Sequence, residues 1–177
     1  KKGKIADTLD KIININRSDN IVSPNKIKTS KIGGKDWRTM HEDSLEFYLD
    51  YETMNSNLGH IIVENNNIGY QNNQFIFQIG LGYIRKGKWL YKSFLAPTND
   101  LVGEITMIKE FWKYVEKVKK EENKTKSHFV HWYSAEPISY KKLQQRVKTV
   151  GTDVPDKDFV DLYQLFRQEP ITINGSL

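Results

Sequence analysis

Apolar and polar side chains alternate along residues 45–52. Leu45, Phe47 and Leu49 share one face of this segment, and polar side chains, among them Asp50 and Glu52, occupy the other. This period of two predicts a strand that buries one face and presents its acids on the other.

Two more strands are expected at 75–85 and 89–95, where apolar and aromatic residues dominate. The turn sequence Lys86-Gly87-Lys88 lies between them and predicts an antiparallel hairpin. Apolar residues then recur at helical spacing over 102–121, with lysines on the other side, which predicts an amphipathic helix.

The remaining patterns predict a buried strand at 127–133, a helix at 134–150 and a short strand at 159–163 that runs into Leu165-Phe166. Right-handed crossovers place the fourth strand beside the first. The expected fold class is therefore α/β, with a mixed five-stranded sheet of three antiparallel and then parallel strands, flanked by helices.

The first 44 residues are polar and rich in turn residues, and we expect a linker or tether with one short helix at 5–15. Residues 53–74 contain several asparagines around a short apolar run and are expected to form a loop insertion. The predicted domain spans 45–177 and is expected to be incomplete at its C-terminus.

The composition of the chain excludes several kinds of functional site. The chain has 177 residues, no cysteine and a formal net charge of +5, which excludes disulfides, thiolate metal sites and a cysteine nucleophile. The longest apolar run is far shorter than the roughly 20 residues of a membrane-spanning helix, and no secretory signal is visible. We expect an intracellular protein, in cytoplasm or nucleus, with no membrane partner.

The basic residues are concentrated in the predicted helical part of the chain. Residues 103–150 hold 11 basic and 6 acidic side chains, whereas 45–102 hold 4 and 5. This distribution is compatible with a polyanionic partner beside an acidic sheet.

Asp50 and Glu52 are the sharpest local signal. Two acids at positions i and i+2 of a strand point the same way, and they repel each other unless a cation neutralises them or one is protonated. Mg²⁺ and Mn²⁺ prefer such oxygen ligands, and two ions can bind the attacking and leaving oxygens of a phosphodiester. The alternative is an ordinary solvent-facing strand.

Three motifs together resemble a known family. Asp50-Tyr51-Glu52-Thr53 resembles the first motif of DEDD exonucleases, and more closely that of ribonuclease-H-like nuclease domains fused to RecB-type modules. His131-Trp132-Tyr133-Ser134-Ala135-Glu136 resembles their later histidine–glutamate motif, and residues 159–166 resemble the following Asp-Leu-aromatic strand. The resemblance covers about 45–177.

The resemblance implies the ribonuclease-H-like fold and a third metal ligand, Glu136, where exonuclease relatives more often have Asp. Glu136 can also be a first-turn residue that stabilises a helix N-terminus. Asp161 is either a further catalytic acid or a structural acid at a strand end. Relatives complete the site with an Asp on a later helix, which this sequence does not contain.

Several residues are candidates for substrate binding. Tyr51, Trp132 and Tyr133 can stack on unpaired bases, or pack in the core. His131 is a substrate-contacting or supporting residue, or a buried histidine, and it points to the face opposite His128. Lys142 and Arg146 can bind phosphates, or lie on a solvated helix face.

Two functional hypotheses follow. The first is a metal-dependent nuclease that uses Mg²⁺ or Mn²⁺, with two ions expected, on Asp50, Glu52 and Glu136. The resemblance implies 3′ to 5′ exonuclease action on single-stranded DNA or RNA ends and a fused or associated RecB-type nuclease or helicase module. The second is a non-catalytic nucleic-acid-binding or scaffold domain of the same fold.

Overall fold

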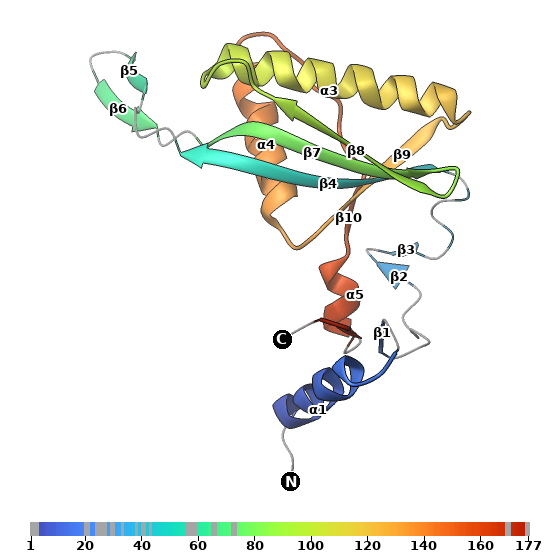
Figure 1. The fold of residues 1–177 in the computed structure, drawn as a ribbon. Coiled ribbons are helices and arrows are strands. Elements are labelled where there is room, and N and C mark those ends of the chain that lie inside the picture. The colour runs from blue at the N-terminus through green and yellow to red at the C-terminus, as the bar shows by residue number, and fades with distance from the viewer. Residues whose placement is uncertain are drawn as a thin grey trace.

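A five-stranded sheet lies at the centre of the protein. Its strands are β4 (Ser44–Asn55), β7 (Gln74–Arg85), β8 (Lys88–Leu95), β9 (Lys126–His131) and β10 (Phe159–Asp161). This computed structural model describes residues 4–19, 22–23, 28, 31–32, 34–37, 39, 42, 44–55, 60–64, 67–71, 74–168 and 171–175. Figure 1 shows the sheet with helices on both sides.

The strands run in the order β10-β9-β4-β7-β8. β7 is antiparallel to β4 and β8, whereas β9 is parallel to β4 and to β10. The predicted fold class is therefore confirmed, including the fourth strand beside the first, and the order is consistent with the ribonuclease-H-like arrangement. The hairpin between β7 and β8 turns at Lys86 and Gly87, both at positive φ, as a tight two-residue turn requires.

Two helices, α3 (Leu101–Glu121) and α4 (Ala135–Lys148), cover one side of the sheet, which we call the helix face. The odd-numbered residues of β4 from Leu45 to Tyr51 are buried here, as the alternating pattern predicts. They join apolar residues of β7, α3 and α4 in one core. α3 begins after Asp100, whose carboxylate accepts the Gly103 N–H at 2.8 Å, as an N-cap does.

A smaller core covers part of the opposite face. Val130 of β9 and Val160 of β10 pack there with Leu165 of α5 (Tyr163–Gln168) and Ile32 of β2 (Lys31–Ile32). β2 pairs with β3 (Lys35–Asp36) in a small hairpin. The part of this face over β7 and β8 keeps exposed aromatic and apolar side chains, so we call it the open face.

The N-terminal segment packs against the end of the chain. The expected helix at 5–15 is α1 (Lys4–Asn16), and it contacts β11 (Thr172–Ile173), which pairs with β1 (Val22–Ser23). Asn16 accepts the Gly175 N–H at 2.6 Å, and Figure 1 shows α1 and β11 together below the sheet. The described part of the expected tether is therefore docked on the domain.

Two local expectations are wrong. Within the expected loop at 53–74, β4 continues to Asn55, and β5 (His60–Glu64) pairs with β6 (Asn67–Gln71) as a separate hairpin. The strand expected over 159–163 ends at Asp161, and α5 follows. The reason is local, because the Asp161 carboxylate accepts the Tyr163 N–H at 3.0 Å and caps the helix.

Candidate functional site

Asp50 and Glu52 lie together on β4, the central strand, and point away from the helix face. Both are exposed, whereas Tyr51 between them is buried in the helix-face core. Asp50 pairs with Gly80 of β7, and Glu52 pairs with Gln78. Residues two apart on a strand lie about 6.6–6.8 Å apart along it. The pair therefore presents two neighbouring carboxylates on an accessible part of the sheet.

This acid pair fits a hydrated divalent cation. Mg²⁺ is commonly held by one or two carboxylates while it keeps several waters, and it needs no closed protein cage. Within the ranges that the structure describes, no group of three or more His, Asp or Glu side chains could hold a metal ion. The structure thus places two carboxylates side by side, and Glu136 does not form a group of three with them.

Glu136 lies instead beside His131. Its Oε2 is 3.5 Å from Nδ1 of His131, and both atoms are buried without a hydrogen-bond partner. His131 faces the helix side of the sheet, where its ring packs edge-on to Phe159. Burial mainly, with the nearby Glu136 carboxylate as a weaker cause, raises the pKa of Tyr51. Glu136 is therefore turned toward Tyr51 and His131, which lie on the helix face.

His128 lies on the other side of the sheet from His131, as the sequence spacing predicts. Its Nδ1 is 2.7 Å from the Ser44 hydroxyl, and its Nε2 is 3.6 Å from the Glu46 carboxylate. These contacts hold it between β9 and β4.

Asp161 has a structural role in this arrangement. Its Oδ1 accepts the backbone N–H of Tyr133 at 2.9 Å as well as that of Tyr163. The first bond holds Tyr133 at a φ of 67°, a left-handed conformation that non-glycine residues rarely adopt. Asp161 thus ties the end of β9 to the start of α5.

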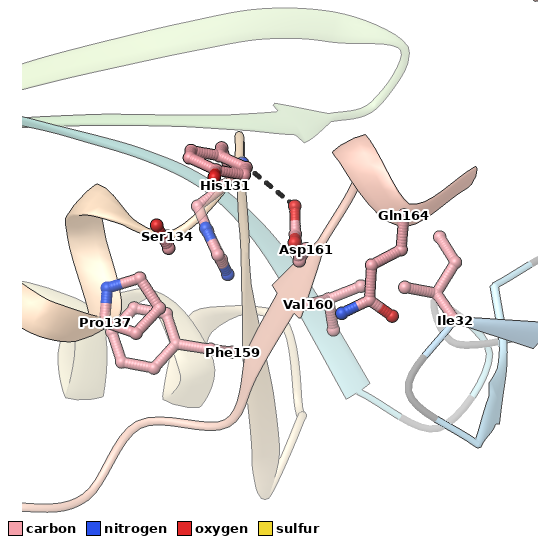
Figure 2. A pocket seen from close by; sticks show the side chains of 9 residues that line it. Ile32, His131, Ser134, Pro137, Phe159, Val160, Asp161 and Gln164 are labelled. Carbon is pink, nitrogen blue, oxygen red and sulfur yellow. Dashed lines mark hydrogen bonds between the residues drawn. The ribbon is translucent and has the colours of Figure 1, made fainter. Parts of the chain in front are cut away.

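A pocket of about 280 Å³ lies where β9 and β10 end. Figure 2 shows Ser134 and Pro137 on one side of it and Gln164 and Ile32 on the other, with His131 and Asp161 between them. Crevices beyond the carboxyl ends of parallel strands are frequent ligand sites. This one is slightly smaller than typical ligand pockets, which span about 300–1,000 Å³.

Two predicted substrate-binding residues are corrected by their surroundings. Tyr51 is only 9% exposed and stacks near Tyr140 at 6.5 Å between ring centroids, so it is a core residue and no base can reach it. The guanidinium of Arg146 binds the buried Glu104 with two hydrogen bonds of 2.5 and 3.1 Å. Arg146 is therefore committed to a carboxylate and is not presented to phosphate.

Of the other four candidates, His131 is buried at 5% exposure and three remain accessible. Trp132 and Tyr133 are 48% and 56% exposed, and both rings contact Tyr163 of α5 edge-on. Lys142 is exposed on α4, where its Nζ donates to the Gln74 side chain at 3.3 Å. All three can meet a ligand, and Trp132 and Tyr133 lie just after the end of β9.

Sequence reasoning missed a lysine whose amine lies among aromatic rings of the core. Nζ of Lys157 lies 4.1 Å from the ring centroids of Phe111 and Tyr140 and donates a hydrogen bond to the Tyr51 hydroxyl. Burial holds the pKa of Lys157 well below its usual range. Its position after Pro155 in a polar loop gives no sequence signal of burial.

It also missed two exposed aromatic residues on the open face, Trp89 and Tyr91 of β8. A signal for them exists, because they alternate on their strand as Gly80 and Gly82 do on the neighbouring one.

The chain was compared with protein families, with curated proteins and with solved structures. Nothing matched. Among the described residues, moreover, no helix has the length and apolar character to cross a membrane.

Proposed function

We propose that the domain is a metal-dependent nuclease that hydrolyses phosphodiester bonds of DNA or RNA. One observation carries the proposal: Asp50 and Glu52 project side by side into solvent from the central strand of a sheet with ribonuclease-H-like order. The motifs at 50–53, 131–136 and 159–166 support it, and their resemblance to DEDD exonucleases favours 3′ to 5′ cleavage of single-stranded ends.

Asp50 and Glu52 would hold one or two Mg²⁺ or Mn²⁺ ions through their carboxylate oxygens. When bound, such ions neutralise phosphate charge and make a coordinated water more acidic. Carboxylates alone repel a phosphodiester, but a cation bound between them and the phosphate turns this repulsion into attraction. The acid pair would thereby orient the scissile phosphate on the open face. Trp132 and Tyr133 would contact the strand near the end of β9.

Glu136 and His131 would act on the acid pair from the other side of the sheet. Their facing atoms lack hydrogen-bond partners, and a buried polar group without a partner costs about 1–3 kcal/mol. A water or a proton between them would relieve that cost. Glu136 is therefore assigned a positioning role, through Tyr51 on β4, in place of a ligand role.

The experiment is a cleavage assay on a single-stranded oligonucleotide with Mn²⁺. We expect Asp50→Asn and Glu52→Gln each to lower the rate at least about 100-fold, equivalent to about 2.7 kcal/mol of transition-state stabilisation. Asp153→Asn and Glu110→Gln remove exposed acids of the loop after α4 and of α3 and should leave the rate unchanged. Equal rates for wild type and Asp50→Asn would refute the proposal.

The second candidate is a nucleic-acid-binding domain without catalysis. The specific observation in its favour is that, among the residues described, the acids of the motifs do not form a group of three around one point. The two candidates differ in metal binding. A nuclease should bind Mn²⁺ in a titration followed by electron paramagnetic resonance and lose that binding in Asp50→Asn, whereas the non-catalytic domain should bind oligonucleotide equally with and without metal.

A further inference from the structure

The open face carries two aromatic side chains next to the acid pair. Trp89 and Tyr91 project from β8, the edge strand, and are 55% and 60% exposed. Ile84 and Leu95 lie on the same face and are exposed to a similar extent. Large side chains of this kind are normally buried, so a cluster of them in solvent is a candidate binding surface.

The rings of Trp89 and Tyr91 pack over glycines of the neighbouring strand β7. A Cβ atom added at Gly82 would lie 2.1 Å from Cζ2 of Trp89, and one added at Gly80 would lie 2.9 Å from the hydroxyl of Tyr91. Any larger residue at Gly82 would therefore displace the indole. Because Gly80 and Gly82 have no side chains, they leave space over β7 in which the two rings lie.

This seating fixes the rings before any ligand arrives. The Trp89 ring also packs against Tyr48 of β4, with 5.2 Å between centroids. A side chain that is already ordered loses little conformational entropy on binding. Both residues still expose more than half of their surface, so aromatic surface remains for a planar ligand.

The residues around the two rings indicate which class of ligand they bind. Tyr91 covers Gly80, and Gly80 is the residue that pairs with Asp50. The rings therefore border the acid pair. Exposed Lys86 and Lys88 lie at the hairpin turn beside Trp89. Aromatic surface flanked by cations suits a strand of nucleic acid, whose bases stack on the rings while its phosphates meet the lysines.

We propose that Trp89 and Tyr91 form a stacking subsite for unpaired bases of a single strand that crosses the open face to the acid pair. This inference rests on the proposed nuclease function and adds to it the residues that would bind the bases of the single strand. A base in a duplex has both π-faces covered by its neighbours, so the subsite selects single strands. Exposed aromatics on a sheet bind RNA bases in the same way in RRM domains, which have a different fold.

The test is binding of a fluorescein-labelled oligothymidylate of about 12 nucleotides, measured by anisotropy in EDTA so that no cleavage occurs. Trp89→Phe and Trp89→Leu both keep an apolar side chain on Gly82, but only Phe has a π-face. We expect Trp89→Leu to weaken binding about tenfold and Trp89→Phe less than about threefold.

Two controls and one further variant distinguish a loss of base stacking from a loss of folding and from a change in charge. Leu90→Ala changes the same strand on its helix-face side and should bind like wild type. An abasic strand of the same length has phosphates and no bases, so its affinity should be equal for wild type and Trp89→Leu. Gly82→Ala, which displaces the indole without removing it, should weaken oligothymidylate binding as Trp89→Leu does. Unchanged thermal unfolding midpoints confirm that each variant is folded.

Equal affinity of wild type and Trp89→Leu for oligothymidylate overturns the subsite, and so does an equal loss of affinity for duplex. If Trp89→Leu instead converts a dimer to a monomer in sedimentation and leaves oligonucleotide binding intact, the occupant is a second copy and the subsite is again overturned. Loss of oligothymidylate affinity in Trp89→Leu, in a protein that never cleaves, would support the subsite and refute the nuclease alone.

Discussion

Glu104→Gln is expected to lower the free energy of unfolding by about 3–5 kcal/mol, the range measured when one partner of a buried ion pair is removed. Glu104 is 1% exposed, and its two carboxylate oxygens bind the Arg146 guanidinium. The substitution leaves that guanidinium, whose side chain is only 15% exposed, without its counter-charge. Domains of this size are stable by about 5–15 kcal/mol, so the loss is a large share of the total.

Glutamine removes the charge of Glu104 and keeps the size of its side chain. Glu104 Oε1 also accepts the Ile76 N–H of β7 at 2.9 Å, and a glutamine carbonyl can still do so. The pair therefore links α3, α4 and β7. The substitution removes the charge and also one of the two oxygens that accept hydrogen bonds from Arg146, because a glutamine NH₂ group cannot accept. Arg146 additionally lies over the Phe75 ring, 5.3 Å from the centroid.

Urea denaturation at neutral pH measures the effect. Glu110→Gln removes an exposed glutamate from the same helix and should change stability by less than about 0.5 kcal/mol. A double variant, Glu104→Met with Arg146→Leu, removes both charges and should recover part of the lost stability. If Glu104→Gln and Glu110→Gln unfold at the same urea concentration, the pair is not a structural hub.

The sheet and the acid pair were predictable because they depend on local periodicity and on general rules. The alternation over 45–52 fixes which residues of β4 face the core, and Asp50 and Glu52 then share the opposite face. Crossover handedness fixes β9 beside β4. Neither conclusion needs a contact between residues far apart in the sequence.

The surroundings of Glu136 and Arg146 were not predictable in the same way. Sequence spacing puts Glu136 near the strand ends, but its direction depends on how the first turn of α4 sits against His131, which is a tertiary contact. Arg146 looks like a phosphate-binding residue on a basic helix until its partner is known. A signal for that partner exists, since Glu104 interrupts the apolar stripe of α3 between Leu101 and Ile108.

Lys157 is the clearest example of a tertiary effect, because nothing in the loop sequence marks it as buried. The loop is pinned to the helix face by hydrogen bonds: the Tyr140 hydroxyl donates to Pro155 O at 2.5 Å, and Phe129 N–H donates to Asp158 O at 2.8 Å. Lys157, between these anchors, is directed into the aromatic core.

We expect Lys157→Met to remove a pH dependence from the stability of the protein. Burial lowers the pKa of Lys157 in the folded state from the usual 10.5, so at intermediate pH the unfolded chain binds more protons than the folded one. Stability therefore rises with pH between the lowered pKa and 10.5, by up to about 1.4 kcal/mol per pH unit. Methionine is of similar length and has no proton to lose, so it should flatten this rise.

The aromatic rings around Lys157 do not reverse the direction of its pKa shift. Cation–π contacts favour the charged amine by about 0.5–2 kcal/mol, but the Lys157 amine hydrogen-bonds a neutral phenol and pairs with none of the described carboxylates. At neutral pH Lys157→Met should thus be more stable than wild type. The same burial raises the pKa of Tyr51 and of Tyr140, so stability falls once unfolded tyrosines ionise above their usual 10.0.

The measurement is the free energy of urea unfolding at several pH values between neutral and about 9, where few unfolded tyrosines are ionised. Lys141→Met, an exposed lysine on α4, is the matched control and should keep the wild-type slope. Parallel slopes for wild type and Lys157→Met would mean that Lys157 keeps its ordinary pKa on folding. A flat line for Lys157→Met beside a rising wild type would assign the slope to this one amine, because the tyrosines act only at higher pH and in the opposite direction.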